Sequence, residues 1–119
     1  MSTVKQLDEQ LNAMVLGGQA MEAFEQFYAD DVVMQENDKE PTAGKAANRE
    51  RELQFFASVE QFHGAAVKAS AAGEGVSFGE WELDVTFKGG SRVVMKQVSV
   101  RQWKDGKIVH EKFYYDGAH

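Results

Sequence analysis

An arginine and a glutamate near the C-terminus are the residues whose types and spacing point most directly to chemistry. Arg101 precedes the turn dipeptide Asp105-Gly106, and Glu111 follows it. Because Asp-Gly favours a tight hairpin, the two side chains are expected on adjacent strands. A covered arginine needs a negatively charged partner, which Glu111 can supply. The pair is then either a structural ion pair that fixes the strand register or a site at which Arg101 polarises a ligand oxygen.

Two strands carry this pair, and the alternation of side chains along each strand divides them between two faces. The strands are expected at 91–104 and 107–116, after a long strand at 76–87 and a hairpin turn at 89–90. The face of Arg101 also holds Met95, Gln97, Ser99 and Trp103, and the face of Glu111 also holds Val109, Phe113 and Tyr115. The opposite faces hold Val94, Lys96, Val98, Val100 and Gln102 on one strand, and Ile108, His110, Lys112, Tyr114 and Asp116 on the other. The pattern does not say which face is covered, and a β-bulge would invert part of the assignment.

Helices are predicted in the first half of the chain, where apolar residues recur at spacings of three and four. The first helix covers 3–16, with Ser2 or Thr3 as its N-cap and two glycines at its end. The second covers about 19–28 and places Phe24, Phe27 and Tyr28 on one side. A short strand is expected at 32–34.

A polar loop at 36–44 contains the only proline of the chain. A third helix is predicted from about 44 to 63, with Gly64 as its stop signal. A weak strand at 65–72 then opens the strand-rich half. Helices first and strands afterwards predict an α+β fold in one domain, 1–119, and not a parallel βαβ arrangement.

The composition excludes several classes of function. The 119 residues include no cysteine, which excludes disulfides, thiolate metal sites and a cysteine nucleophile. The net charge of −6 argues against nucleic-acid binding, because an acidic surface repels phosphate backbones. The three histidines have no metal-ligand spacing, so neither a metal nor another cofactor is expected. No stretch is long and apolar enough for a membrane span, and no signal peptide is evident, so we expect a cytoplasmic protein.

The order of these elements resembles the nuclear-transport-factor-2-like superfamily, which has a cone-shaped α+β fold. The residues that carry the resemblance are 27–33 (FYADDVV), 103–109 (WKDGKIV) and 113–116 (FYYD), with Pro41 and Gly44 before the third helix. Within the superfamily the chain is most similar to the SnoaL-like branch, which includes polyketide cyclases. The resemblance covers nearly the whole chain, but the fold hosts isomerases, dehydratases, hydrolases and non-catalytic binding proteins.

The resemblance implies three helices packed on a curved, mixed or antiparallel sheet that encloses a pocket for a small molecule. It places Gln97, Ser99, Arg101 and Trp103 inside the pocket, with Glu111, Phe113 and Tyr115 beside them. It also places Glu36 where the ketosteroid-isomerase branch has its proton-shuttling carboxylate, although the very polar run 36–40 favours an exposed loop acid at this position. The other sheet face, with Val94, Val98, Val100, Ile108 and Tyr114, is expected to form a homodimer.

The chain departs from the catalytic patterns of these relatives. The isomerases hold an oxyanion with a tyrosine and a carboxylic acid, but the matching positions here are Asn12 and Ser99. The epoxide-hydrolase branch needs an Asp-Arg-Asp arrangement, and the strand of Arg101 has no inward aspartate. The cyclases use an acid late in the sheet, for which Glu111 and Asp116 are available.

Two functions follow as hypotheses. The first is a cofactor-free isomerase, cyclase or dehydratase acting on a small apolar carbonyl or hydroxyl compound. Glu36 or Glu111 would transfer the proton, and Arg101 with Gln97 and Ser99 would hold the oxyanion. Aromatic side chains would exclude water, namely Phe24, Phe27, Tyr28, Trp103, Phe113 and Tyr115. The second is a non-catalytic ligand-binding or assembly module in which the Arg101–Glu111 pair is structural.

Overall fold

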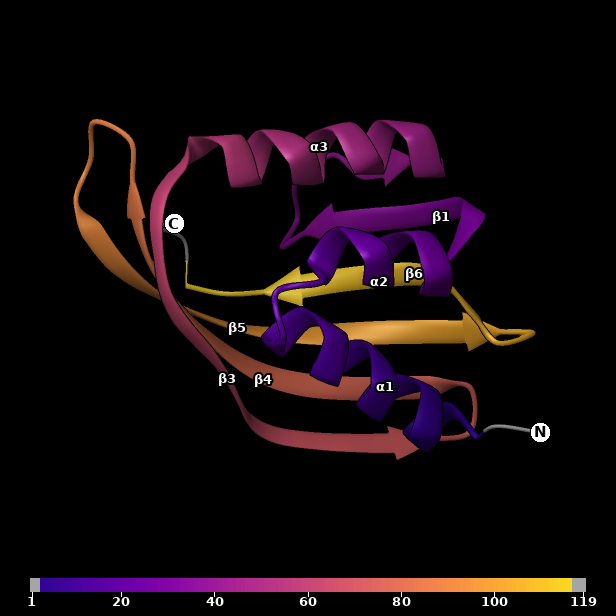
Figure 1. Ribbon diagram of the computed structural model, residues 1–119. Helices are drawn as coiled ribbons and strands as arrows, with labels where there is room; N and C mark the ends of the chain where they lie inside the picture. Colours follow the sequence, from indigo (N-terminus) through magenta and orange to yellow (C-terminus); the bar gives the residue numbers. More distant parts are fainter. Residues whose placement is uncertain (1–2, 117–119) are drawn as a thin grey trace.

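The computed structural model describes residues 3–116 as three helices and one mixed sheet of six strands (Figure 1). The helices are α1 (Val4–Leu16), α2 (Ala20–Phe27) and α3 (Lys45–Ser58). The strands are β1 (Tyr28–Glu36), β2 (Thr42–Ala43), β3 (Val59–Gly73), β4 (Val76–Phe87), β5 (Arg92–Lys104) and β6 (Lys107–Tyr114). The order across the sheet is β2-β1-β6-β5-β4-β3, and all neighbours are antiparallel except β1 and β6. The predicted α+β class is therefore confirmed.

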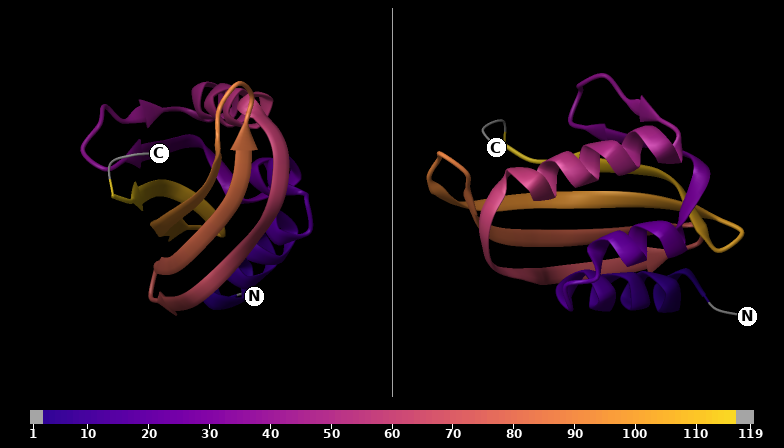
Figure 2. Two further views of the ribbon diagram at one scale, coloured as in Figure 1. Left: turned by 90° about the vertical axis from the view of Figure 1, so that its left-hand side faces the viewer. Right: turned by 45° about the horizontal axis from the view of Figure 1, so that its top comes forward.

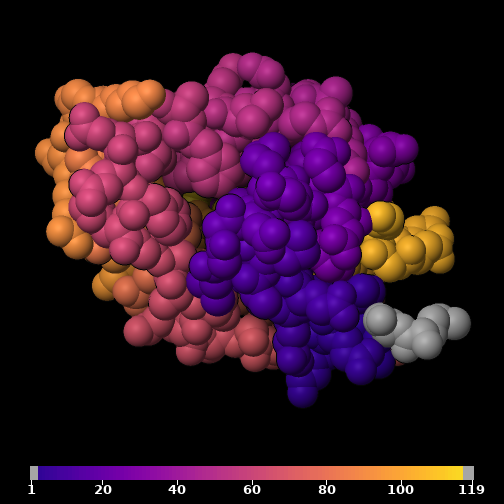
Figure 3. All heavy atoms as spheres, in the orientation of Figure 1, coloured from indigo at the N-terminus to yellow at the C-terminus, as the bar shows by residue number. Residues whose placement is uncertain are grey.

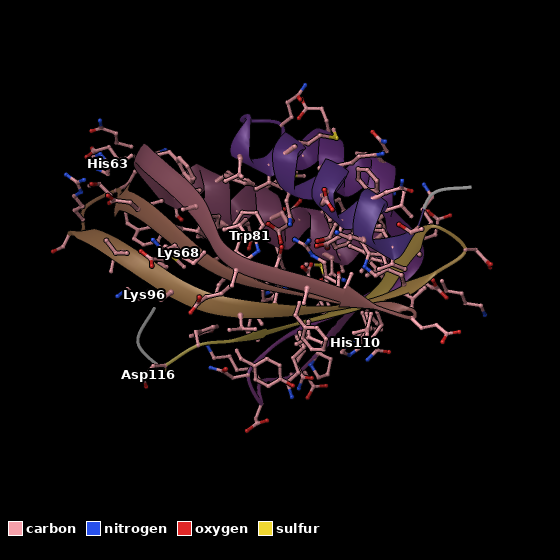
Figure 4. The ribbon with its side chains drawn as sticks, turned by 90° about the horizontal axis from the view of Figure 1, so that it is seen from below. His63, Lys68, Trp81, Lys96, His110 and Asp116 are labelled. Atoms are coloured by element: carbon pink, nitrogen blue, oxygen red, sulfur yellow. The ribbon has the colours of Figure 1, made fainter. Side chains whose placement is uncertain are left out.

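The helices lie on one face of a strongly curved sheet (Figure 2). α1 lies over β4 and β3, α2 lies over the middle of that face, and α3 runs along the end of the sheet that contains β1 (Figure 1). In Figure 4 the side chain of Trp81 points to the helix side, and that of His110 lies on the opposite side. The curvature leaves room for a cavity between the helices and the concave face.

The first helix ends at the predicted residue and begins one residue later than predicted, at Val4, with Thr3 as its N-cap. Thr3 forms a capping box, because its hydroxyl accepts from the Gln6 amide at 3.2 Å and the Gln6 side chain accepts from the Thr3 amide at 2.9 Å. At the other end Gly17 is the C-cap, and Gly18 follows with φ of 83°. These signals position α1 against the sheet.

The third helix ends earlier than predicted. Its pattern of Phe55, Phe56, Val59 and Phe62 suggests a helix up to residue 63, but α3 ends at Ser58 and Val59 opens β3. The reason is tertiary pairing: β4 is 12 residues long, and β3 pairs with it from Val59 opposite Phe87 onwards. The weak strand predicted at 65–72 is thus the second half of a strand of 15 residues.

The polar loop before α3 is partly structured. The structure places β2 within it, pairs Ala43 with Val33, and extends β1 beyond the predicted 32–34. The buried side chain of Asn48 donates to the carbonyls of Val32, Thr42 and Gly44 at 3.3, 2.9 and 2.9 Å. This amide fixes the start of α3 against β1, and so positions the residues that follow on the helix.

A register shift in the last hairpin corrects one face assignment. Gln102 lies opposite His110, but Trp103 lies opposite Ile108, so β6 has one extra residue at this point. Ile108 is fully buried under the helices, and the prediction that it lies on the outer face is wrong. After the shift Glu111 returns to the covered face, opposite Arg101.

The hydrophobic core lies between α1, α2 and the half of the sheet formed by β1, β6 and β5. Its buried members are Leu11, Ala23, Phe24, Phe27, Tyr28, Val32, Met34, Trp103 and Ile108. Burying each large side chain contributes about 1.5–3 kcal/mol. Within residues 3–116 no helix is long and apolar enough to cross a membrane.

Candidate functional site

A cavity of about 150 Å³ lies between the helices and the concave face of the sheet. Figure 3 shows a hollow between the indigo N-terminal helices and the pink segment that joins α3 to β3. The apolar lining consists of Leu11, Val15, Ala20, Met21, Phe24, Phe55, Phe56, Phe62, Leu83 and Phe113. The polar or amphipathic lining consists of Tyr28, Glu52, Trp81, Gln97, Ser99, Arg101 and Glu111. Such an apolar cavity with a few polar groups is typical of a small-molecule site.

Regular secondary structure explains why these residues converge. Alternation along β5 turns Gln97, Ser99 and Arg101 to the same covered face. On α3, Glu52 lies three residues before Phe55 and four before Phe56, so a carboxylate shares the cavity-facing side of the helix with two aromatic rings. The cavity therefore combines rigid strand positions with one helix face.

Arg101 is the centre of a buried polar network at the floor of the cavity. Its Nε donates to Glu111 Oε2 at 2.9 Å, and its Nη1 donates to Asp8 Oδ1 and Asn12 Oδ1 at 2.7 Å each. The hydroxyl of Tyr28 donates to the other oxygen of Glu111. Arg101 is therefore held between two carboxylates, one from α1 and one from β6.

The network continues away from the cavity into the core. The Ser77 hydroxyl donates to Asp8 Oδ1 at 2.7 Å, and Trp103 Nε1 donates to Ser77 Oγ at 2.9 Å. Asn12 also donates to Asp8 Oδ2 at 3.4 Å. Because each of these buried polar groups has a partner, the network fixes the position of α1 on the sheet.

Burial and neighbouring charges keep both Arg101 and Tyr28 in their protonated forms. Burial alone would lower the pKa of Arg101, but the charges of Glu111 and Asp8 outweigh it, and the pKa rises. Burial, together with the charge of Glu111, raises the pKa of Tyr28 well above its ordinary value. Tyr28 therefore remains a hydrogen-bond donor at neutral pH.

Glu52 differs from the other acids of the site because its carboxylate makes no hydrogen bond or ion pair to any residue within 3–116. Burial raises its pKa from 4.5 to about 7, and the charges of Glu111 and Glu36 add to the effect while Arg51 opposes it. A carboxyl group that titrates near neutrality in an apolar cavity can both take and return a proton.

Two buried donors of the cavity wall lack partners in the described part of the chain. These are Ser99 Oγ on β5 and Trp81 Nε1 on β4. Gln97 also faces the cavity, and no described residue bonds to its side-chain amide. The guanidinium of Arg101 lies over the Trp81 ring, with Cζ 5.9 Å from the centroid. These groups could bind a ligand oxygen.

A second cavity, called here the vestibule, adjoins the first. It also has a volume of about 150 Å³, and its lining is Glu36, Arg51, Glu52, Phe55, Leu83, Met95, Gln97 and Phe113. Glu36 forms an ion pair with Arg51 and accepts from the Tyr115 hydroxyl at 2.9 Å. The vestibule is thus more polar than the first cavity.

The structure brings together most of the residues that the sequence indicated. Phe24, Tyr28, Gln97, Ser99, Arg101, Glu111 and Phe113 line the first cavity. Phe27 and Trp103 instead pack on each other in the core with ring centroids 6.3 Å apart. Glu36 lines only the vestibule. Tyr115 follows β6 directly, and its hydroxyl donates to the Glu36 carboxylate. The roles of all these residues in binding or catalysis stay predictions.

Sequence reasoning missed Glu52, Asp8 and Trp81. Glu52 could have been found from its spacing to two phenylalanines on α3, which places an acid on an apolar helix face. Asp8 could have been found from its spacing of four to Asn12 beside the apolar stripe of α1. The strand of Arg101 carries no inward acid, but α1 supplies Asp8 and β6 supplies Glu111. An acid–arginine–acid arrangement is therefore present in Asp8, Arg101 and Glu111. Among residues 3–116, no three His, Asp or Glu side chains gather where they could hold a metal ion.

The chain belongs to the SnoaL-like domain family, whose model matches residues 1–115. This agrees with the resemblance seen in the sequence. A comparison with curated proteins finds no match.

Solved structures support the same fold. A protein from Mesorhizobium loti, described as a SnoaL-like polyketide cyclase, is 28% identical with a TM-score of 0.85, over 96% of this chain and all of that chain. An NTF2-like protein from Burkholderia pseudomallei is 15% identical with a TM-score of 0.82, over 98% and 92% of the two chains. A protein from Catenulispora acidiphila with a ketosteroid isomerase-like fold, in complex with trimethylamine, is 13% identical with a TM-score of 0.77, over 97% and 88%.

Proposed function

We propose that this protein is a cofactor-free enzyme that moves a proton on a small apolar molecule carrying a carbonyl or hydroxyl group. Isomerisation, cyclisation by carbon–carbon bond formation and dehydration can all begin by removing a proton from the carbon next to a carbonyl. The observation that carries the proposal is the position of Glu52, a carboxyl group that lines an apolar cavity without a described partner, where burial raises its pKa to about 7.

Glu52 is a better proton carrier than the two acids suggested by the sequence. Glu111 is already committed to Tyr28 and Arg101, and Glu36 to Arg51 and Tyr115. A carboxylate whose oxygens already accept from these donors is not free to take a proton from a substrate. Glu111 then acts through its charge, which favours the protonated form of Glu52.

The unpaired donors of the cavity would stabilise the oxygen of the substrate. When the proton leaves for Glu52, the negative charge of the enolate gathers on that oxygen. The Ser99 hydroxyl and Trp81 Nε1 are buried and have no described partner, so they are available without breaking an existing hydrogen bond. In this proposal Arg101 and Gln97 support the same oxygen from β5.

The cavity limits the size of the reacting group. A volume of about 150 Å³ is similar to that of an apolar cavity that takes up benzene. The reacting part of the substrate is therefore a single ring or a short branched chain. The aromatic side chains around it exclude water, which keeps the pKa of Glu52 high.

The alternative is a ligand-binding module without turnover. One observation favours it: Arg101 has carboxylate or amide partners at Nε and Nη1, as expected of a structural group. In that case the cavity would bind the same small molecules, and Glu52 would only set the pH dependence of binding.

Hydrogen–deuterium exchange distinguishes the two functions before a natural substrate is known. Cyclohexanone and cyclopentanone would be incubated with the protein in D₂O, and loss of the α-proton signals followed by NMR. The enzyme hypothesis expects exchange above the buffer rate that is lost in Glu52→Gln and retained in Glu50→Gln, an exposed acid on the same helix. Binding of the ketones without accelerated exchange would favour the binding module.

We also infer that the protein forms a homodimer through the bare face of the sheet. Phe78, Val98 and Val100 lie side by side there, because Val100 pairs with Phe78 and Val98 neighbours it on β5. Tyr114 lies opposite Val98 on β6. Val94 and Tyr114 are 50% and 46% exposed, so a monomer would leave an apolar patch in water.

A further inference from the structure

The cavity and the vestibule share one wall. Glu52 and Phe55 from α3, Leu83 from β4, Gln97 from β5 and Phe113 from β6 line both of them. Shared residues from four elements mean that the two spaces meet at these side chains. Glu52 and Gln97 are the polar members of this shared wall, and neither has a hydrogen-bond partner among residues 3–116.

The sizes of the two spaces suggest that they serve one ligand. Each has a volume of about 150 Å³, which alone holds a molecule the size of benzene. Ligand sites usually begin at about 300 Å³. The two spaces together reach this size, whereas either alone does not.

The two spaces differ in polarity. The inner cavity has aromatic and aliphatic walls from α1, α2 and β3 that the vestibule lacks. The vestibule instead has Glu36 and Arg51, and Arg51 is about one-third exposed. A ligand that fills both spaces therefore needs an apolar end and a polar end.

The charges of the vestibule select the polar group. Arg51 and Gln97 offer donors, while Glu36 and ionised Glu52 offer acceptors. The cation Arg51 is already paired with Glu36, so no spare positive charge remains for an anionic ligand. An ammonium group only donates, so it would bind Glu36 and Glu52 but leave the donors of Arg51 and Gln97 without an acceptor. A hydroxyl group can donate and accept at once, and it carries no charge.

We infer that the cavity and the vestibule form one extended site for an uncharged amphipathic alcohol. Its ring or branched chain occupies the inner cavity, its hydroxyl group meets Arg51 in the vestibule, and its connecting carbons pass between Glu52 and Gln97. This inference rests on the proposed function, since the ligand would be its substrate or product and would carry, besides the hydroxyl group, the carbonyl group next to which Glu52 removes the proton. It deepens that function by placing Glu52 beside the middle of the ligand.

Calorimetric titration with a matched series of probes tests the extended site. Benzyl alcohol reaches only the inner cavity, whereas 3-phenylpropan-1-ol is long enough to span both spaces. Two additional methylenes and one hydrogen bond predict binding of the longer alcohol that is roughly 50- to 100-fold tighter. Propylbenzene, 3-phenylpropanoate and 3-phenylpropylamine should all bind more weakly than the longer alcohol.

Three substitutions distinguish the contribution of the vestibule to binding from that of the inner cavity and from that of a surface arginine. Arg51→Met keeps the side-chain length but removes the donors, and should weaken 3-phenylpropan-1-ol about fivefold while leaving benzyl alcohol unchanged. Arg49→Met is the matched control, because Arg49 lies on the same helix and pairs with Glu25 at 2.5 Å on the surface. It should change neither affinity. Ala20→Leu, which narrows only the inner cavity, should weaken both alcohols.

Two results would overturn the inference. One is equal binding of the short and long alcohols, or of propylbenzene and the long alcohol. The other is tighter binding of the carboxylate or the amine. If either occurs while Glu52-dependent exchange of cyclohexanone persists, the extended site is wrong and the proposed function stands. If the exchange also fails, both are wrong.

Discussion

Arg101 on β5 and Glu111 on β6 stand directly opposite each other, and Arg101 Nε donates to Glu111 Oε2 at 2.9 Å. The turn between the two strands has positive φ at Asp105 and Gly106, 52° and 78°, as a tight hairpin requires. The ion pair therefore lies where the turn, the register shift and the strand alternation all place it. It forms the floor of the cavity and also attaches α1 to the sheet through Asp8.

Removing the arginine should be strongly destabilising. Arg101→Met leaves two buried carboxylates, Asp8 and Glu111, without their cation, so we expect a loss of about 3–5 kcal/mol in the free energy of unfolding. Urea unfolding followed by circular dichroism measures this. The control is Arg92→Met, which breaks the exposed ion pair with Asp84 and should change stability little. Equal effects of the two substitutions would contradict a structural role for the buried network.

The stability of the protein should depend on pH through Glu52. Between 4.5 and about 7 the folded state holds a proton on Glu52 that the unfolded state has lost, so the free energy of unfolding falls as the pH rises through this range. Glu52→Gln removes this dependence. The variant should therefore gain about 1–3 kcal/mol relative to the wild type between pH 5 and pH 8.

Urea unfolding of both proteins at several pH values measures this difference. Glu50→Gln on the same helix is the control, and it should follow the wild type at every pH. A constant difference between Glu52→Gln and the wild type would mean that Glu52 is already ionised at pH 5.

Gly79 should be required for the position of Trp81. A Cβ atom at Gly79 would lie 2.9 Å from Trp81 Nε1, which is closer than side chains tolerate. Gly79→Ala should therefore shift the indole, alter the near-UV circular dichroism and cost about 1–3 kcal/mol. Gly64→Ala is the control, since a Cβ there meets nothing within 4 Å and φ is not positive. An unchanged spectrum for Gly79→Ala would show that the indole has room to move.

A charge on the bare sheet face should prevent dimer formation. Sedimentation should give the wild type twice the mass of one chain, and Val98→Lys the mass of one chain, because a buried unpaired ammonium is costly. The control is Leu53→Lys, since Leu53 is similarly exposed but lies on α3. A monomeric wild type would refute the proposed interface.

The sequence was sufficient to predict those features that depend on local signals. The capping box at Thr3, the turn at Asp105-Gly106 and the alternation on β5 each depend on residues close together in the chain. They led to the α+β class and to the placement of Gln97, Ser99 and Arg101 on one common face. The family resemblance supplied which face is covered, because alternation alone does not.

Features that depend on distant pairing were not predicted. Val59 and Phe62 fit a helix until β4 pairs with them, and Ile108 fits the outer face until the register shift turns it inward. Glu52 was hidden for a similar reason. It lies in a charged stretch of α3. Its spacing to Phe55 and Phe56 indicates a shared helix face, but only the position of the helix over the sheet shows that this face is covered.

The pKa of Glu52 tests the central claim most directly. Carbon-13 NMR would follow the side-chain carboxyl signals of the glutamates from pH 3 to pH 9, with Glu52→Gln to assign the signal. The account predicts one glutamate with a midpoint near 7 that disappears in the variant. A midpoint for Glu52 near 4.5 would contradict it, because it would show that the cavity does not raise the pKa of Glu52 towards the working pH, as the proposed proton transfer assumes.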